Sequence, residues 1–331
     1  MSVLPVLCRF AVVLLSGIAV AALAQPSSSL VPTPYPTRPI KLVVPFTAAS
    51  ATDILARLVG DQLATRRGQP VVVENRPGAG GTIGAAMVAK AEPDGYTLPV
   101  VSVGHVVNPH IYRSLPYDTL RDFAGVIRLG NLPSVLAVSP SLGVKSVAEL
   151  ISLAKAKPGV LNYASGGVGS ASRINAEKFR AATGIDVVHV PTKGAQEMMV
   201  ETITGRTQFG FYPIIAALPM IRDGKLTALA VSSSRRSAVL PELPTMAEAG
   251  VLGAEFDFWI GLLAPAKTPQ ELVAKLNSEI ARDLERPDVR QRLAALGVEP
   301  MPLSPGEFDA YMREQFTALG RVVKAAGVKA D

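Results

Sequence analysis

Short runs of β-branched residues alternate with longer segments of helical periodicity from residue 40 to the end of the chain. Residues 40–44 predict a strand, and the apolar positions of 53–63 recur at the spacing of one helix face. Further strands are predicted at 71–73, 97–103, 135–138, 161–164, 187–190, 207–211, 226–231 and 256–263. Strand–helix alternation along the whole chain predicts an α/β fold with mainly parallel sheets.

Several helix starts are marked by a serine or threonine that is followed three residues later by glutamate. This capping pattern occurs at 146–149, 268–271 and 304–307. The last two segments also place a proline at the expected first helical position. The sequence therefore predicts helices that begin at these three points.

The N-terminus differs from the rest of the chain. Arg9 precedes an apolar run over 10–23, which ends in Ala22-Leu23-Ala24. A short charged start, an apolar stretch too short to span a membrane comfortably and a small-x-small exit predict a signal peptide, 1–24, cleaved after Ala24. The alternative is an uncleaved anchor helix. The Pro- and Ser-rich residues 25–34 predict an extended leader.

Composition removes several classes of function. The only cysteine, Cys8, lies in the predicted signal peptide, so disulfides, thiolate catalysis and cysteine-ligated metals are excluded from the mature chain. The chain has a formal charge of +6, but its basic residues are scattered and only 5% of its residues are aromatic. This pattern argues against nucleic acid as a partner and favours attraction of small anions.

Two segments have the pattern of a ligand-binding loop, in which a strand ends in small and hydroxyl residues that open a helix. Helix N-termini present N–H groups and a positive dipole end to an anion. The first segment comprises Phe46, Thr47, Ala48, Ala49, Ser50, Ala51, Thr52 and Asp53, and the second includes Ser165, Gly167, Gly169, Ser170, Ala171, Ser172 and Arg173. The alternative for each is a hydroxyl that only caps the helix. Two such loops in one α/β chain favour a ligand site beyond the strand ends.

Motifs for other chemistries do not occur in the sequence. The glycine-rich stretch 78–84 fails as a dinucleotide fingerprint, because Ile83 stands where the third glycine is needed. No Walker A or G-x-S-x-G sequence is present. The three histidines show no metal-ligand spacing and none can be placed beside the serines of the second loop: His105, His110 and His189. The sequence predicts no enzyme, no metal site and no cofactor.

The chain resembles one family over its whole length from residue 35. Among the segments that carry the resemblance are Glu-Asn-Arg-Pro-Gly-Ala-Gly-Gly at 74–81, Pro-Asp-Gly-Tyr-Thr at 93–97 and Leu-Pro-Thr-Met-Ala-Glu-Ala-Gly at 243–250. Further matches lie at 35–46, 68–73, 108–109, 115–118, 145–150, 189–194 and 259–265. These segments resemble the Bug receptors, the periplasmic solute-binding proteins of tripartite tricarboxylate transporters, also called the TctC family.

The resemblance implies a periplasmic, monomeric protein with a two-lobed, type II-like binding fold and a ligand cleft between the lobes. Lobe 1 would comprise 35–128 and 249–331, and lobe 2 would comprise 129–248. The ligand would be a small carboxylate held largely by backbone N–H groups of the two loops. Further contacts are expected from Thr192, Lys193, Gly194 and Tyr212. The partners would be the membrane subunits of a tripartite transporter, and no cofactor is implied.

Departures from the family pattern bear on the ligand. Ala48-Ala49-Ser50 replace a usual Pro-Gly-Gly, which restricts φ and adds side-chain bulk. Arg173 replaces a frequent histidine and is expected to bind a carboxylate in bidentate fashion. Thr192 replaces a common tyrosine. Tyr212 replaces a frequent aspartate and removes a negative charge from the expected cleft wall. These changes predict a ligand that has a carboxylate and no ammonium group.

Three alternatives remain at this level. A sensor that presents its closed form to a signalling protein would use the same fold. An exported α/β hydrolase or lyase would need a nucleophile–base pair. An interaction module without a small ligand would lack a polar cleft between its lobes.

Overall fold

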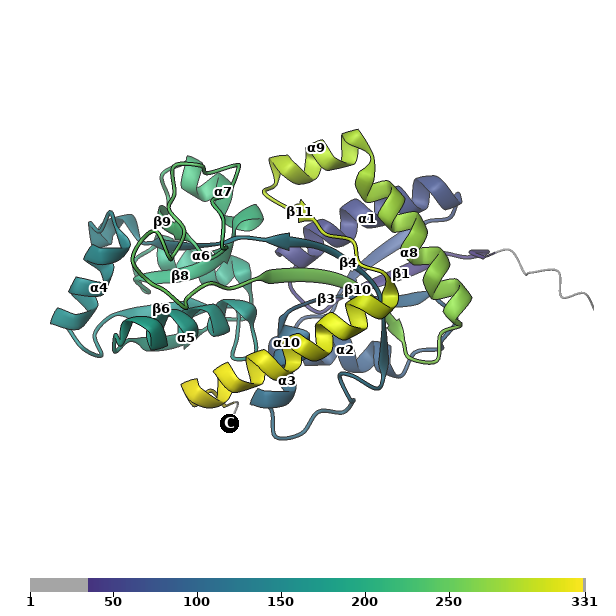
Figure 1. Cartoon of the computed structure of the whole chain (residues 1–331), viewed down its shortest axis with the longest axis horizontal. Helices are drawn as coiled ribbons and strands as arrows, with labels where there is room; N and C mark the ends of the chain where they lie inside the picture. The colour runs from purple at the N-terminus through teal and green to yellow at the C-terminus, as the bar shows by residue number, and fades with distance from the viewer. Residues whose placement is uncertain (1–34, 330–331) are drawn as a thin grey trace, which may run out of the picture. The chain divides into compact units, whose positions relative to one another are not determined.

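Two β-sheets flanked by helices make up the unit Pro36–Asp331 of the computed structural model, which describes residues 35–329 (Figure 1). The first sheet has the strand order β11-β4-β10-β3-β1-β2. Its strands are β1 (Ile40–Val44), β2 (Val71–Asn75), β3 (Thr97–Ser102), β4 (Phe123–Leu132), β10 (Phe258–Pro265) and β11 (Glu299–Pro300). Its helices are α1 (Ala51–Arg67), α2 (Thr82–Ala89), α3 (Gly104–Ile111), α8 (Gln270–Glu285), α9 (Pro287–Ala295) and α10 (Pro305–Ala326). We call these elements lobe 1.

The second sheet has the order β7-β6-β8-β5-β9. Its strands are β5 (Ser134–Val138), β6 (Asn162–Ser165), β7 (Val188–Pro191), β8 (Phe209–Pro213) and β9 (Thr227–Val231). Its helices are α4 (Val147–Ala156), α5 (Ala171–Thr183), α6 (Ala195–Ile203) and α7 (Ile214–Arg222). These elements form lobe 2, whose buried side chains gather in two apolar clusters.

The chain passes between the lobes twice. It leaves lobe 1 through β4, which leads into β5 after Pro133, and it returns from β9 to β10. The two passages lie beside each other because β4 and β10 are paired antiparallel (Figure 1). The boundary predicted between residues 128 and 129 falls inside β4. The predicted signal peptide and leader, 1–34, lie outside the described residues.

The α/β class and the two-lobed architecture are confirmed, but the sheets are mixed rather than mainly parallel. β1 pairs parallel with β2 and β3, and β6 pairs parallel with β7 and β8. The strands that cross between lobes run the other way: β10 pairs antiparallel with β3 and β4, and β5 pairs antiparallel with β8 and β9. A chain that leaves one sheet and later returns to it supplies these reversed strands.

Two of the three predicted helix starts have the expected cap. The Ser304 side chain accepts the backbone N–H of Glu307, whose carboxylate in turn accepts the N–H of Ser304. Ser146 likewise accepts the N–H of Glu149. The third start is displaced by one residue, because α8 has Pro269 as its N-cap rather than as its first helical residue, with no side-chain cap.

Within residues 35–329, no helix is long and apolar enough to cross a bilayer. In the same residues, no group of three or more His, Cys, Asp or Glu side chains is placed to hold a metal ion.

Candidate functional site

The first predicted loop connects β1 to α1. Ser50 is the N-cap of α1, and its hydroxyl accepts the N–H of Asp53 at 3.3 Å. Ala49 adopts φ +58°, a left-handed conformation that is unusual for a residue other than glycine. The restriction of φ that the sequence predicted for this loop therefore applies at Ala49, which adopts a left-handed conformation although it has a side chain.

Asp53 stabilises this loop through the hydrogen bonds of its carboxylate. Its carboxylate accepts the Ala49 N–H at 2.9 Å, the Asn75 amide at 2.9 Å and two guanidinium bonds from Arg57. Burial by itself would raise the pKa of Asp53, but the hydrogen bonds from Arg57, Asn75 and Ala49 outweigh it and hold the pKa below its ordinary value. Asp53 thus stays ionised and is engaged in positioning the loop.

The second predicted loop connects β6 to α5 and is tied together by hydroxyl groups. Ser170 is the N-cap of α5, and its hydroxyl donates to the Gly167 carbonyl at 2.7 Å. The Ser172 hydroxyl accepts the N–H of Gly166 at 3.1 Å. Gly167 has φ +116°, which only glycine adopts without strain. The hydroxyl residues of this loop therefore fix its backbone as well as capping the helix.

A serine–histidine pair corrects one prediction. The sequence placed no histidine near Ser165, but the Ser165 hydroxyl lies 2.6 Å from Nε2 of His189, because β6 and β7 are neighbouring parallel strands. Ser165 is fully buried, and its hydroxyl also contacts the backbone of Gly167. The buried Ser165 hydroxyl thus connects the second loop to β7.

The third predicted segment, 192–194, connects β7 to α6. The Thr192 hydroxyl donates to the Ser165 carbonyl at 2.8 Å, which joins this segment to the second loop. Gly194 is the N-cap of α6 and faces the first loop across the lobes. A Cβ atom at Gly194 would lie 2.6 Å from Oγ1 of Thr47, so the absence of a side chain lets the two lobes meet here.

The lobes also touch at a second glycine. A Cβ atom on Gly169 would lie 2.2 Å from Oδ1 of Asn108 in α3. A Cβ atom on Gly80 would lie 2.9 Å from Cα of Gly169, so the two backbones are in direct contact. Asn108 in turn donates to the Gly80 carbonyl at 3.1 Å. The glycines of both lobes thus permit a closed arrangement.

A cavity of about 60 Å³ lies between these loops. Of the predicted site residues, those that line it are Phe46, Thr47, Ser50, Ala51, Thr52, Ser170, Ala171, Ser172 and Gly194. The N-terminal residues of three helices, α1, α5 and α6, lie in its wall. Among the described residues that line it, none has a charged side chain. Its polar character comes from hydroxyl groups and from backbone at helix ends.

The remaining predicted residues lie outside this lining: Ala48, Ala49, Asp53, Ser165, Gly167, Gly169, Arg173, Thr192, Lys193 and Tyr212. Lys193 has an exposed side chain. Tyr212 is buried in lobe 2, where its hydroxyl donates to Thr202 at 2.6 Å and where burial raises its pKa. The expectation that Tyr212 replaces a charge on the cleft wall is not met in this arrangement.

Arg173 is likewise not part of the cavity lining. Its Nε atom lies 2.9 Å from Oε1 of Glu177, an ion pair without the angle of a hydrogen bond. Glu177 is almost fully buried and also accepts the Tyr163 hydroxyl and, at 2.8 Å, Nε of Arg180. The guanidinium predicted to bind a ligand carboxylate is therefore engaged within lobe 2.

Seven cavity residues were not predicted: Ser102, Ser134, Gly166, Ala195, Met198, Pro213 and Phe258. Ser102 ends β3 and Ser134 begins β5, so both hydroxyls lie beside the passages between the lobes. In the sequence, each of them is only a serine at the end of a strand. Its place in the cavity can be inferred only when the order of the strands in the sheets is known.

Two α/β lobes joined by paired strands, with a cavity between them whose wall holds helix N-termini and hydroxyl groups, define a two-lobed solute-binding protein. Comparison with known proteins agrees. The family model of the tripartite tricarboxylate transporter family receptor, TctC, matches residues 55–328. The chain belongs to this family of receptors.

Solved structures of relatives are closely similar in fold. Rpa4515 of R. palustris with adipate has a TM-score of 0.87 and 38% identity, with 89% of this chain and 99% of that chain covered. MatC from Rhodopseudomonas palustris with bound malate has a TM-score of 0.83 and 34% identity, with coverage of 87% and 100%. The periplasmic binding protein BugD has a TM-score of 0.85 and 31% identity, with coverage of 90% and 100%.

Proposed function

We propose that this protein is a periplasmic receptor that captures a small carboxylate between its lobes and delivers it to the membrane subunits of a tripartite transporter. The observation that carries the proposal is the meeting of three helix N-termini at one hydroxyl-lined cavity. Helix N-termini have N–H groups without intrahelical partners and favour negative charge. Two relatives whose structures resemble this one hold carboxylates, adipate and malate.

The proposed contacts come from the residues that line the cavity in each loop. The N-terminal turns of α1 and α5, at 51–52 and 171–172, supply backbone N–H groups to the carboxylate, and Gly194 does so at α6. Hydroxyl groups of the lining serines and threonines complete the site. The residues behind them, including Asp53 and Ser165, hold the loops in place. The receptor acts as an exported monomer and needs no cofactor.

The ligand proposed here carries a carboxylate and no ammonium group. An ammonium group removed from water needs an acidic partner or several acceptors. The side chains that line the cavity offer none with a negative charge, and the nearby carboxylate of Asp53 is bound by Arg57 and Asn75. Tyr212 does not contribute to this preference, because it lies in the lobe 2 core.

Ligand entry requires the lobes to part. A cavity of about 60 Å³ lies well below the range of about 300–1,000 Å³ that is usual for small-molecule sites, so it is too small for a dicarboxylate such as adipate. The paired strands β4 and β10 are the connections about which the lobes would open, as in other hinged domain pairs.

A thermal-shift titration tests the proposal. The purified protein is unfolded and refolded to remove carried ligand, and then titrated with adipate, malate and glutamate. We expect a dicarboxylate to raise the melting temperature with concentration, by up to about 2.7 kcal/mol of stabilisation at a hundredfold excess over Kd. Glutamate, with its ammonium group, is expected to bind more weakly. A flat response to every compound would contradict the proposal.

Two glycine variants provide the matched control. Gly194→Ala introduces a methyl group against Thr47 and is expected to weaken the response at least tenfold, because the Thr47 side chain must be displaced before the lobes can close. Gly306→Ala, at the start of α10, places its methyl group in open space and should respond as the unaltered protein does. Equal responses in the two variants would show that the ligand lies elsewhere.

A further inference from the structure

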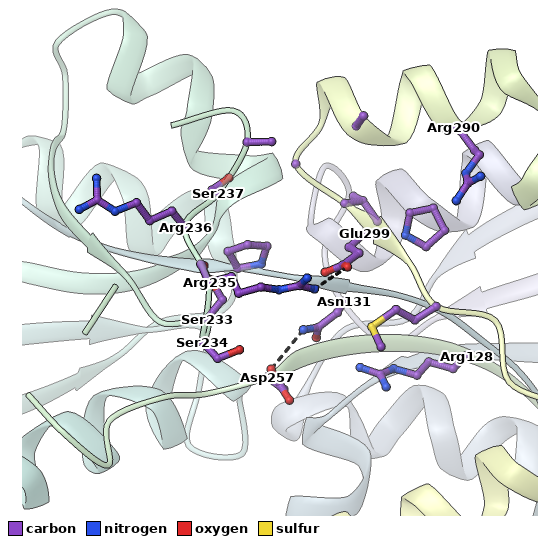
Figure 2. Close-up of a pocket in the computed structure, with 17 residues that line it drawn as sticks. Arg128, Asn131, Ser233, Ser234, Arg235, Arg236, Ser237, Asp257, Arg290 and Glu299 are labelled. Atoms are coloured by element: carbon purple, nitrogen blue, oxygen red, sulfur yellow. Dashed lines mark hydrogen bonds and ion pairs between the residues drawn. The ribbon is translucent and has the colours of Figure 1, made fainter. Parts of the chain in front are cut away.

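A second and larger cavity, of about 600 Å³, lies beside the passages between the lobes (Figure 2). Its walls come from β4, from the α9–β11 connection of lobe 1 and from the loop 233–238, which follows β9 in lobe 2. It shares no lining residue with the smaller cavity. A volume of this size lies within the range of about 300–1,000 Å³ that is usual for small-molecule sites.

Three guanidinium groups face this cavity from two lobes. Figure 2 shows Arg128 and Arg290 on the lobe 1 side and Arg235 reaching across from lobe 2. Arg235 forms an ion pair with Glu299 at 2.8 Å, which bridges the lobes. Arg236 also lines the cavity, but its guanidinium turns away to pair with Glu248.

Arg128 and Arg290 have no ion pair with any side chain of residues 35–329. Arg290 is exposed, whereas Arg128 is only 5% exposed and its Nε atom has no hydrogen-bond partner. The Arg128 guanidinium lies 4.4 Å from the centre of the Tyr311 ring. A buried cation without a counter-charge is costly, so this side chain favours an anion beside it.

The acidic side chains that line the cavity do not meet this need fully. Glu299 is occupied by Arg235. Asp257 accepts the Asn131 amide at 3.2 Å and is not within ion-pair distance of Arg128. The Asn131 Oδ1 atom is itself buried without a partner. With three guanidinium groups against two carboxylates, the lining carries an excess positive charge.

We propose that this cavity is a second binding site, which takes a small oxyanion, a phosphate or a carboxylate. Arg128 and Arg290 supply the counter-charge, since a guanidinium can bind either group through two parallel hydrogen bonds. The Arg235–Glu299 pair closes the site from the lobe 2 side. Because its walls belong to both lobes, an anion bound there stabilises the present arrangement of the lobes.

Calorimetric titration with two probes tests this site and identifies the chemistry. Inorganic pyrophosphate represents the phosphate source and citrate the carboxylate source, at constant ionic strength. We expect at least one probe to bind saturably to the purified protein. The probe that binds shows which oxyanion the site prefers. Absence of saturable binding by both would overturn the proposal.

Variants assign the binding to one cavity. Arg290→Ala removes an exposed side chain and should raise Kd for the probe at least tenfold, as should Arg128→Gln. Arg206→Ala removes an exposed guanidinium elsewhere in lobe 2 and controls for general charge. Unchanged binding in Arg290→Ala would show that the anion does not bind in this cavity and would overturn the proposal. If Arg128→Gln does not fold, Arg290→Ala decides.

Discussion

Ala49 occupies a backbone conformation that its side chain disfavours. At φ +58° the Cβ atom crowds the backbone, which costs roughly 1–2 kcal/mol for an L-residue. Asp53 compensates by accepting the Ala49 N–H at 2.9 Å. The loop therefore keeps this left-handed turn with stored strain.

Ala49→Gly is therefore expected to stabilise the protein. Relief of strain exceeds the entropy cost of the added glycine, which is about 0.5–1 kcal/mol, and leaves a net gain of up to about 1 kcal/mol. The neighbouring Ala48→Gly adds the same entropy cost without relief, because Ala48 does not have a positive φ. Urea unfolding measures both. A loss of stability in Ala49→Gly equal to that in Ala48→Gly would contradict the argument.

His105 makes stability depend on pH. Burial lowers the pKa of His105 to about 4, while the unfolded chain titrates near 6.5. Between about pH 6.5 and pH 4, the His105 imidazole is protonated in the unfolded state but stays neutral in the folded state. The stability that His105 contributes above pH 6.5 is therefore lost as pH falls. The linked loss is up to roughly 3 kcal/mol.

The corresponding test compares the unaltered protein with His105→Gln. Free energies of unfolding are measured between pH 4.5 and pH 7.5. We expect the difference in stability between the two proteins to shrink as pH falls, because only the unaltered protein has the buried imidazole. Parallel pH profiles would show that His105 does not account for the slope.

At the scale of elements, the β6–α5 unit is held by charge as well as by its apolar face. Glu177 in α5 is almost fully buried and is surrounded by Arg173, Arg180 and the Tyr163 hydroxyl of β6. A buried carboxylate depends on each of these partners. The arginine expected to bind ligand is thus part of the internal structure of lobe 2.

Arg173→Ala is expected to lower the free energy of unfolding without any ligand present, by about 1–3 kcal/mol, since one partner of a buried carboxylate is lost. Arg206→Ala breaks an exposed pair with Glu201 that solvent screens, and it should lower the free energy of unfolding much less. Thermal unfolding of the ligand-free protein compares them. Unchanged stability in Arg173→Ala would return this residue to a role in ligand binding.

Helices and strands that are marked by a pattern of neighbouring residues could be predicted from the sequence. β1 was predicted with its observed bounds, and the cap at Ser304 followed from a four-residue pattern. β4 was missed because Arg128, Gly130 and Asn131 interrupt its apolar run, although most of the strand is buried. Such residues are explained only by the cavity and the neighbouring strands that they contact.

In the candidate site, too, the residues with a local sequence pattern were predicted and those placed by distant strands were not. The two loops were found because a strand end, hydroxyl residues and a helix start are adjacent in sequence. Ser102 and Phe258 were missed because their place depends on strand order. The sequence does contain a signal for the ion pair of Arg173, because Glu177 lies four residues later, the spacing at which helical side chains pair.

At the scale of the whole molecule, glycines determine how far the lobes can close. A methyl group at Gly169 would meet the Asn108 amide at 2.2 Å, whereas one at Gly166 in the same loop would meet no atom closer than 3.7 Å. Overpacking of this kind costs about 1–3 kcal/mol. Gly169→Ala should therefore shift the protein toward an open arrangement, and Gly166→Ala should not.

A measurement of the distance between the lobes tests whether Gly169→Ala shifts the protein toward the open arrangement. Residues 35–329 contain no cysteine, so Val72→Cys in lobe 1 and Val188→Cys in lobe 2, both at exposed positions, provide two labelling sites. Energy transfer between the labels should fall in the Gly169→Ala protein. Equal transfer in the two glycine variants would show that this contact does not limit closure.

The double passage between the sheets also sets an order of assembly. All strands of the second sheet come from one continuous stretch, whereas the first sheet joins strands from both ends of the chain. β10 cannot pair with β3 and β4 until everything between them has been made, and contacts so distant in sequence form slowly. Lobe 2 can thus fold as a local nucleus and bring the ends of lobe 1 together. A destabilising substitution in the β5–β9 region would consequently delay the folding of both lobes, while one in α8 or α10 would leave lobe 2 already formed.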